Sequence, residues 1–234
     1  MTTQPATVVV TGASGNLGRA VAQAFSERGD NLVLVASRRE PLVAAFGGDD
    51  SKRLIAPANL LDRKAVAAAV QAALARFGRI DVLCNIAGGF RMGPPVHEAS
   101  DADWSAMFDI NVHTLLNMVH AVVPHMLGAG TGRIINVGAS SAQKGAAQMG
   151  PYIAAKSAVI RITETMAAEL RTKGINVNCV LPTIIDTPEN RAEMPDADPK
   201  RWVAPANLAK VFVFLGSDAA RAIHGAAIPV SGLS

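Results

Sequence analysis

Short apolar runs rich in β-branched residues alternate with longer stretches of helical periodicity, and this feature constrains the fold more than any other. The apolar runs lie at about residues 7 to 11, 31 to 36, 52 to 57, 80 to 86, 132 to 138, 174 to 181 and 226 to 230. The helical stretches lie at 15 to 28, 62 to 77, 101 to 127, 150 to 173 and 205 to 216. Such alternation is typical of βαβ units, and nearly continuous apolar strands are typical of sheets covered on both faces. We therefore predict an α/β fold: a doubly wound parallel sheet of seven strands with helices on both faces.

The length of 234 residues and the absence of repeats or linkers predict one domain spanning residues 1 to 234. Residues 88 to 98 and 186 to 205 interrupt the alternation with prolines, turn residues and mixed charge. Each segment follows a strand end, the edge at which open α/β sheets bind ligands. A connection as long as the second is often functional, so we expect residues 186 to 205 to form a lid.

Composition excludes several classes of partner. Lys plus Arg is 22 and Asp plus Glu is 19, so the net charge is 22 − 19 = +3, and the scattered basic residues give no nucleic-acid footprint. Cys84 and Cys179 lie in apolar runs, as buried free thiols of a reducing compartment do. The start, MTTQPATVVV, has no basic n-region, and no apolar run reaches a membrane-spanning length of about 18 residues. We expect a cytoplasmic protein without a membrane or nucleic-acid partner.

A glycine-rich segment, Thr11-Gly12-Ala13-Ser14-Gly15-Asn16-Leu17-Gly18, joins the first strand to the first helix. Glycines there allow a tight turn and close approach of a pyrophosphate to free N–H groups. The alternative is an ordinary turn into a helix. Its position after the first strand of a βαβ unit favours a dinucleotide site.

The end of the second strand bears on the choice of dinucleotide. NAD sites usually carry an acidic residue there, whereas this strand ends in Ser37 and Arg38. Ser37 leaves room for a 2′-phosphate, and Arg38 can pair with it through its planar guanidinium. The alternative is a pair of solvated arginines at a helix start. We predict that NADP(H) is preferred and that NAD(H) is possible.

Tyr152, the single tyrosine of the chain, lies four residues before Lys156 in a helical stretch. This spacing places the phenol and the ammonium on one helix face. A Lys charge about 4 Å away is able to lower a Tyr pKa by about 3 units from its usual ~10. We therefore expect Tyr152 to act as an acid or base near neutral pH; the alternative is a core Tyr beside a surface Lys.

With three further motifs, the chain resembles the short-chain dehydrogenase/reductase family over essentially its whole length. These motifs are Asn85-Ile86-Ala87-Gly88 after the fourth strand, Asn111 in Phe108-Asp109-Ile110-Asn111, and Pro182 with Thr187 after the sixth. The resemblance implies a Rossmann-like sheet of order 3-2-1-4-5-6-7 and hydride transfer from a nicotinamide. It also implies a homodimer or homotetramer packed through the helices that carry Asn111 and Tyr152.

The resemblance also implies roles for single residues. Tyr152 would donate the proton, Lys156 would hold the ribose and depress the Tyr pKa, and Asn111 would anchor a water of a proton relay. The cofactor would contact Gly12, Ser14, Gly15, Asn16, Leu17, Gly18, Ser37, Arg38, Asn59, Leu60, Ile86, Ala87, Gly88, Tyr152, Lys156, Pro182, Ile185 and Thr187. Two departures are the glycine spacing and Asn59, which stands where the family has an Asp.

A third departure affects catalysis. The family's catalytic Ser precedes the Tyr by thirteen positions, and 152 − 13 = 139 is Ala139, with Ser140 one position out of register. Losing one such donor costs about 3 to 4 kcal/mol, so an unactivated ketone would react slowly unless Ser140 substitutes. Ala at this position, the glycine spacing and the Asp186-Thr187-Pro188 segment are similar to the quinonoid dihydropteridine reductase branch of the family. That branch has an acidic residue after the second strand and no Asn at position 111, so this chain combines two patterns.

The sequence therefore predicts an NAD(P)H-dependent oxidoreductase acting on a quinonoid dihydropterin or another small cyclic conjugated compound. The alternatives are a carbonyl or 3-oxoacyl thioester reductase that uses Ser140, and a non-catalytic NADPH-sensing regulator. We expect no metal site, since His113 and His120 share a helix without a completing ligand. Phe90, Arg91 and Met92 are candidates for lining the substrate pocket or for simple packing.

Overall fold

Seven parallel strands form one sheet in the order β3-β2-β1-β4-β5-β6-β7 in the computed structural model, which describes residues 5–234. The strands are β1 (Thr7–Thr11), β2 (Asn31–Val35), β3 (Arg53–Ile55), β4 (Val82–Asn85), β5 (Gly132–Val137), β6 (Ile175–Pro182) and β7 (Ala227–Val230). This confirms the predicted parallel sheet and its strand order. Residues 1–4, within the segment from which we expect no signal peptide, lie outside the described residues.

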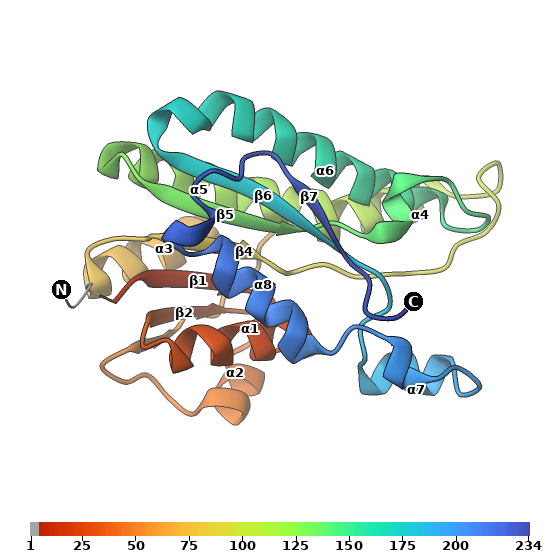
Figure 1. Cartoon of the computed structure of the whole chain (residues 1–234), viewed down its shortest axis with the longest axis horizontal. Coiled ribbons are helices and arrows are strands. Elements are labelled where there is room, and N and C mark those ends of the chain that lie inside the picture. Colours follow the sequence, from red (N-terminus) through yellow and green to blue (C-terminus); the bar gives the residue numbers. More distant parts are fainter. Residues whose placement is uncertain (1–4) are drawn as a thin grey trace.

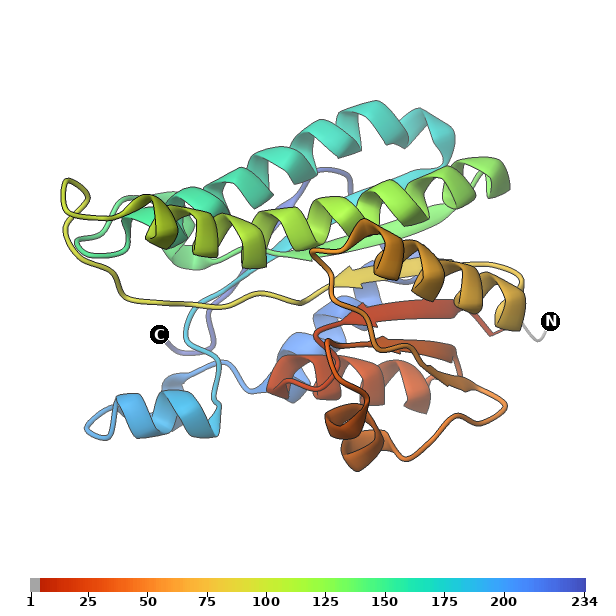
Figure 2. The ribbon, with the colours of Figure 1, turned by 180° about the vertical axis from the view of Figure 1, so that it is seen from behind.

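Helices cover both faces of the sheet (Figure 1, Figure 2). One face carries α1 (Asn16–Glu27), α2 (Arg39–Phe46) and α8 (Pro205–Leu215). The opposite face carries α3 (Arg63–Phe77), α4 (Asp101–Phe108), α5 (Thr114–Ala129) and α6 (Gly150–Leu170). The doubly wound single-domain α/β fold predicted from the alternation is therefore correct.

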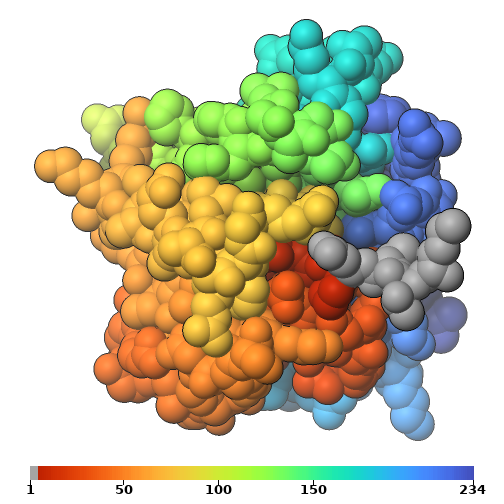
Figure 3. Space-filling view, turned by 90° about the vertical axis from the view of Figure 1, so that its left-hand side faces the viewer, coloured from red at the N-terminus to blue at the C-terminus, as the bar shows by residue number. Residues whose placement is uncertain are grey.

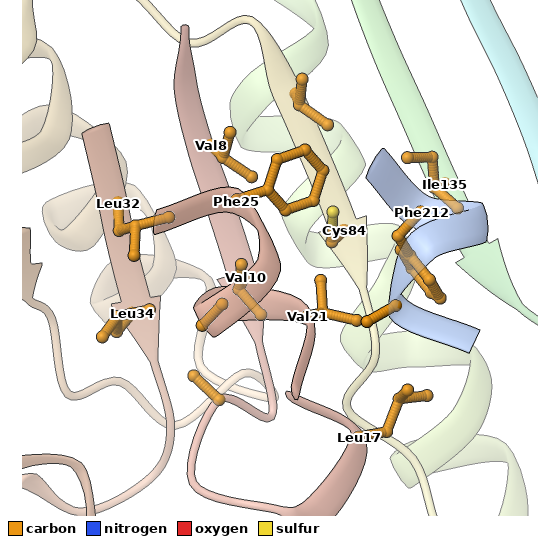
Figure 4. Packing of buried hydrophobic residues seen from close by; sticks show 14 of the residues in the cluster. Val8, Val10, Leu17, Val21, Phe25, Leu32, Leu34, Cys84, Ile135 and Phe212 are labelled. Carbon is orange, nitrogen blue, oxygen red and sulfur yellow. The ribbon is translucent and has the colours of Figure 1, made fainter. Parts of the chain in front are cut away.

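Each face of the sheet has its own apolar core. Successive strand residues point to opposite faces, so alternate residues of β1 and β2 reach one core and the residues between them reach the other. On the first face they meet Phe25 of α1 and Phe212 of α8, both fully buried (Figure 4). On the second face Val9 and Val33 pack with residues of α3, α5 and α6. The two cores hold the strand ends, and the loops that follow them, in fixed positions.

The stretch predicted as one helix over residues 101 to 127 is interrupted. A π-helical turn, Asp109–His113, separates α4 from α5. The Asn111 side-chain amide donates to the Met107 carbonyl at 3.0 Å, the acceptor that α-helical geometry would give to the backbone N–H of Asn111. Such single π turns are frequent at functional sites.

Two further helices were not predicted. The alternation left residues 39 to 46 without an element, but they form α2, of which only Leu42 is buried. The segment expected as a lid contains α7 (Pro188–Glu193), which Thr187 caps by accepting from the Asn190 N–H at 3.1 Å. Both helices are too short for apolar periodicity to reveal them.

All strands end at one edge of the sheet, and α7 lies beyond that edge at the lower right of Figure 1. Figure 3 looks at the opposite end, where residues of α3, α5 and the connection between α2 and β3 form the surface. Among residues 5–234, no helix is long and apolar enough to span a bilayer.

Candidate functional site

A cleft of about 740 Å³ lies at the carboxyl edge of the central strands. The turn from β1 into α1 forms its floor, and two glycines are sterically required there. Gly12 has φ +64°, and a Cβ on it would lie 3.0 Å from the backbone of Ala87. A Cβ on Gly18 would lie 2.2 Å from the Gly12 carbonyl oxygen. The turn thus brings bare backbone to the cleft at the N-terminus of α1, where anionic groups are favoured.

Thr11 joins this turn to the loop after β4, a role that sequence reasoning missed. Its hydroxyl oxygen accepts from the N–H groups of Ile86 at 2.9 Å and Ala87 at 3.1 Å, and donates to the Cys84 carbonyl at 3.3 Å. The Thr immediately before the first glycine was the available signal. The Thr11 hydroxyl therefore connects the turn after β1 to the loop after β4 at the bottom of the cleft.

Most residues predicted to contact the cofactor meet in this cleft. Those that line it are Gly12, Ser14, Gly15, Asn16, Leu17, Gly18, Ser37, Asn59, Leu60, Ile86, Ala87, Gly88, Ile185 and Thr187. Four predicted residues do not line it: Pro182, which ends β6 and is buried, and Arg38, Tyr152 and Lys156. The fourteen that do line it come from five separate loops.

Sequence reasoning missed seven further lining residues. They are Ala36, Ala58, Leu61, Ala106, Asp109, Ile110 and Thr114. Ala36 and Ala58 follow β2 and β3, so strand ends could have indicated them. The last four come from α4, the π-helical turn and α5, which reach the cleft by tertiary packing and carry no local signal.

The two arginines after β2 differ in their surroundings. Arg39 is engaged with the Asp49 carboxylate at 2.7 Å and with the Ile55 carbonyl at 3.4 Å. Arg38 follows the cleft residue Ser37, is exposed, and forms no ion pair with any residue in the described range 5–234. The Arg38 guanidinium is therefore open to solvent near the cleft, whereas the Arg39 guanidinium is held by Asp49 and Ile55.

Tyr152 and Lys156 lie in the first turns of α6, one helical turn apart as predicted. Lys156 is only 5% exposed, and its Nζ donates to the Val137 carbonyl at 2.8 Å. Burial lowers the pKa of Lys156 to about 8 and raises the pKa of Tyr152 to about 12. The expected lowering of the Tyr152 pKa by Lys156 is therefore wrong for the free protein, because burial disfavours the phenolate and dominates the shift.

Asn111 and Lys156 approach each other across Gly88. A Cβ on Gly88 would lie 2.8 Å from Asn111 Oδ1 and 3.2 Å from Lys156 Nζ. The Asn111 side chain is fixed by Gly89, whose N–H donates to Oδ1 at 3.1 Å and whose carbonyl accepts from Nδ2 at 3.0 Å. The absence of a side chain at position 88 allows these two polar groups to come close to the backbone of Gly88, which itself lines the cleft.

Ala139 follows β5 and packs in the same buried cluster as Tyr152, with 5% exposure. Ser140 is half-buried and begins a 3₁₀ turn, Ser140–Gln143. Ala139, the residue that the family resemblance aligns with the catalytic Ser, is therefore more deeply buried than Ser140.

The lid is connected to the glycine turn by a side-chain hydrogen bond. Asn16 Nδ2 donates to Glu189 Oε2 at 2.8 Å. Hydrogen bonds from its own backbone N–H, the Thr187 hydroxyl and the Asn16 amide lower the pKa of Glu189. At the base of the lid, Ile185 forms a parallel bridge with Val203, and Asp186 pairs with Arg191 at 2.6 Å. The segment predicted as a lid is therefore connected to the glycine turn by one side-chain hydrogen bond and is held at its base by a β-bridge and an ion pair.

His113 and His120, the two histidines considered for a metal site, are at the surface. His113 Nδ1 lies 2.7 Å from Asp109 Oδ1, and His120 is exposed. Over residues 5–234 we find no group of three or more His, Cys, Asp or Glu side chains that could hold a metal ion.

Comparison with known proteins matches this chain to one family over most of its length. The model of the short chain dehydrogenase family matches residues 6–198. The D-threitol dehydrogenase of Mycolicibacterium smegmatis is 34% identical over 236 residues, covering 96% of this chain and 90% of that protein. The 3-oxoacyl-(acyl-carrier-protein) reductase FabG of Thermotoga maritima is 30% identical, covering 96% and 95%. A crystal structure of NAD+-bound xylitol dehydrogenase superposes with a TM-score of 0.87 at 26% identity, covering 97% of this chain and 98% of that one.

Proposed function

The chain belongs to the short chain dehydrogenase family of oxidoreductases, and from this premise we propose a reductase that prefers NADP(H) and protonates a small cyclic conjugated substrate from Tyr152. One observation carries the proposal. The glycine turn and Gly88 line one cleft, Asn111 and Lys156 approach each other at Gly88, and Lys156 lies one helical turn from Tyr152.

The residues present fit a dinucleotide. A Cβ on Gly12 or Gly18 would collide with backbone, so the cradle presents N–H groups at the start of α1 to a pyrophosphate. Thr187 and Ile185 line the far side of the same cleft, where a nicotinamide would lie. When bound, a reduced nicotinamide supplies a hydride, which is two electrons and one proton.

The unpaired Arg38 beside Ser37 supports the NADP(H) preference, since a planar guanidinium binds a 2′-phosphate well. The NAD+ bound to the xylitol dehydrogenase belongs to a chain only 26% identical to this one. If the proposal is right, Arg38→Ala lowers kcat/KM for NADPH by ten- to a hundredfold and leaves that for NADH nearly unchanged. Equal losses with both coenzymes, or a wild-type preference for NADH, would contradict it.

Tyr152 supplies the proton in the proposed reaction. With a ketone, the C=O π bond breaks, the carbon gains the hydride, and the oxygen takes the phenolic proton. With a quinonoid ring, the hydride adds to the conjugated system, the π bonds shift, and the phenolic proton goes to a terminal nitrogen or oxygen, so that the product carries one new hydrogen on each of two heteroatoms. Burial keeps the pKa of Tyr152 at about 12, so the phenol holds its proton at neutral pH. A solvent proton then returns to Tyr152 through Lys156, whose pKa is about 8, and through the relay water that the family resemblance assigns to Asn111.

Ala139 supports an activated substrate, because a polarised acceptor depends less on the missing hydroxyl donor. Quinonoid dihydropterin is the specific acceptor that we propose to test first. A second candidate is a carbonyl or 3-oxoacyl thioester reductase that uses Ser140, and its support is the similarity to FabG.

An acceptor screen with NADPH and NADH in parallel tests the proposal, with Tyr152→Phe as the inactive control. Turnover of quinonoid or pterin acceptors that falls more than fiftyfold in Tyr152→Phe, with NADPH binding retained, supports it. Turnover of acyl thioesters that depends on Ser140 would favour the second candidate. Tight NADPH binding without turnover of any acceptor would indicate a regulator.

A further inference from the structure

Phe90 contacts the ring of Tyr152. The two ring centroids lie 4.9 Å apart with an interplanar angle of 86°, an edge-to-face arrangement. Phe90 nevertheless remains 50% exposed. An aromatic ring that packs against the proposed proton donor is therefore partly open to solvent in the described part of the chain.

Backbone contacts hold Phe90 in this place. Its segment, residues 88 to 98, meets the segment before α6 where the Gly93 N–H donates to the Gln148 carbonyl at 2.8 Å. Gln148 has φ +61°, the left-handed conformation that a non-glycine residue seldom adopts. A Cβ on Gly150 would lie 2.8 Å from Val96 Cγ2, so the two segments are in close contact. Phe90 is thus presented by a supported loop and not by a free end.

The other side chain at this point is also apolar. Ala139 packs in the cluster that holds Tyr152, so the surroundings of the phenol include a methyl group as well as the phenyl ring of Phe90. Apolar and aromatic groups recognise a ligand by its shape and π character. A flat unsaturated ring can lie against an aromatic ring, whereas the out-of-plane hydrogens of a saturated ring keep it at a greater distance.

We propose that Phe90 is a specificity-determining residue whose exposed ring holds a flat, unsaturated ring substrate beside the Tyr152 hydroxyl. The inference rests on the proposed function of Tyr152 as the proton donor and names the class of ring that this donor serves. We call the Phe90 ring the platform. A flat ring can bind to the platform without being reduced, so the proposed role of Phe90 and the proposed function of Tyr152 can be tested separately.

Binding of 2-naphthol, a flat ring without a reducible group, tests the platform directly. We expect calorimetry on the NADP+-loaded protein to give a Kd that rises roughly three- to tenfold in Phe90→Leu and is retained in Phe90→Trp. Phe214→Leu is the matched control, because Phe214 of α8 is 43% exposed on the opposite face of the sheet. No binding of 2-naphthol by the unaltered protein, or equal Kd values in Phe90→Leu and the control, would overturn the proposal.

Turnover gives a second readout. The ratio of kcat/KM for 1,4-naphthoquinone to that for trans-1-decalone compares a flat and a saturated ring system of the same carbon skeleton. We expect Phe90→Leu to lower this ratio three- to tenfold, chiefly through KM for the quinone, and Phe214→Leu to leave it unchanged. An unchanged ratio in Phe90→Leu overturns the platform. Phe90-dependent binding of 2-naphthol without reduction of either compound would support the platform and contradict the proposed function.

Discussion

The methyl group of Ala139 bears on the chemistry that we propose for Tyr152. Ala139 lies in the buried cluster that contains Tyr152, and the family resemblance aligns it with a residue that donates a hydroxyl proton. Restoring the hydroxyl should therefore help substrates that need a second donor and do little for substrates that are already polarised.

For Ala139→Ser we expect kcat/KM for cyclohexanone to rise ten- to a hundredfold, because one donor of this type is worth on the order of 10² to 10³ in rate. The kcat/KM for 1,4-naphthoquinone should change less than threefold. Steady-state kinetics with NADPH measures both. Ser140→Ala is the matched control. If Ser140→Ala abolishes ketone reduction in the otherwise unaltered protein, then Ser140 is the hydroxyl donor and the Ala at position 139 does not lower the rate.

The burial of the Lys156 ammonium lowers the free energy of unfolding of the protein. Its pKa falls from the usual 10.5 to about 8 because burial disfavours the ammonium. A lowered Lys pKa means that the unfolded chain binds more protons between pH 8 and 10.5, so stability rises with pH across this window. Below pH 8 the full burial cost is present.

We expect Lys156→Met to raise the free energy of unfolding at pH 7 by about 2 to 3 kcal/mol, with the advantage shrinking as pH rises from 8 to 10.5. Urea unfolding at pH 7 and at pH 10 in the absence of cofactor measures it, with the exposed Lys64→Met as control. A variant less stable than the unaltered protein at pH 7 would mean that the hydrogen bond to Val137 outweighs burial.

At the scale of elements, the sequence predicted the strands. It did not predict the π-helical turn or the cleft residues of α4 and α5, which are brought into place by tertiary contacts. Strands of a covered sheet are nearly continuous apolar runs, so β1 was predicted at its observed bounds and the other strands to within about two residues at each end. The π-helical turn carries Asn111, whose side chain contacts Gly89, a residue 22 positions distant that local periodicity cannot reveal. For the same reason, the motif residues of the cleft were predictable, and those contributed by α4 and α5 were not.

The contact between α7 and the glycine turn predicts an electrostatic effect on cofactor binding. The Glu189 carboxylate accepts from Asn16, which lines the cradle proposed for the phosphates. A carboxylate beside phosphates is repulsive, whereas the amide oxygen of a Gln can keep the hydrogen bond without the charge.

We therefore expect Glu189→Gln to lower the Kd for NADPH roughly three- to tenfold at 10 mM NaCl, with most of the gain lost at 500 mM because of screening. Fluorescence titration of NADPH measures both. Glu193→Gln is the control, because Glu193 lies on the same helix and is exposed like Glu189 but has no contact with Asn16. A weaker affinity in Glu189→Gln would mean that the charged hydrogen bond holds the lid closed over the cofactor.

At the scale of the whole molecule, the outer surface of α5 bears on assembly. Leu116 is 36% and Leu127 is 43% exposed on this helix, which follows the turn carrying Asn111. Single apolar side chains scattered on a surface need no partner. Two exposed leucines on one helix face beside α6 instead fit the homodimer or homotetramer that the family resemblance implies. We propose that the chain associates through the α5 and α6 surface.

Light scattering should then give a mass of two or four times 24.3 kDa at micromolar concentration. Leu116→Arg combined with Leu127→Arg should lower that mass, because the interface would bury two unpaired charges in each copy. Val43→Arg, at a similar 37% exposure on α2, should leave the mass unchanged. A single-chain mass for the unaltered protein would contradict association. An unchanged mass in the double variant would place the interface elsewhere, and a dimer remaining from a tetramer would mean that α5 and α6 form one of two interfaces.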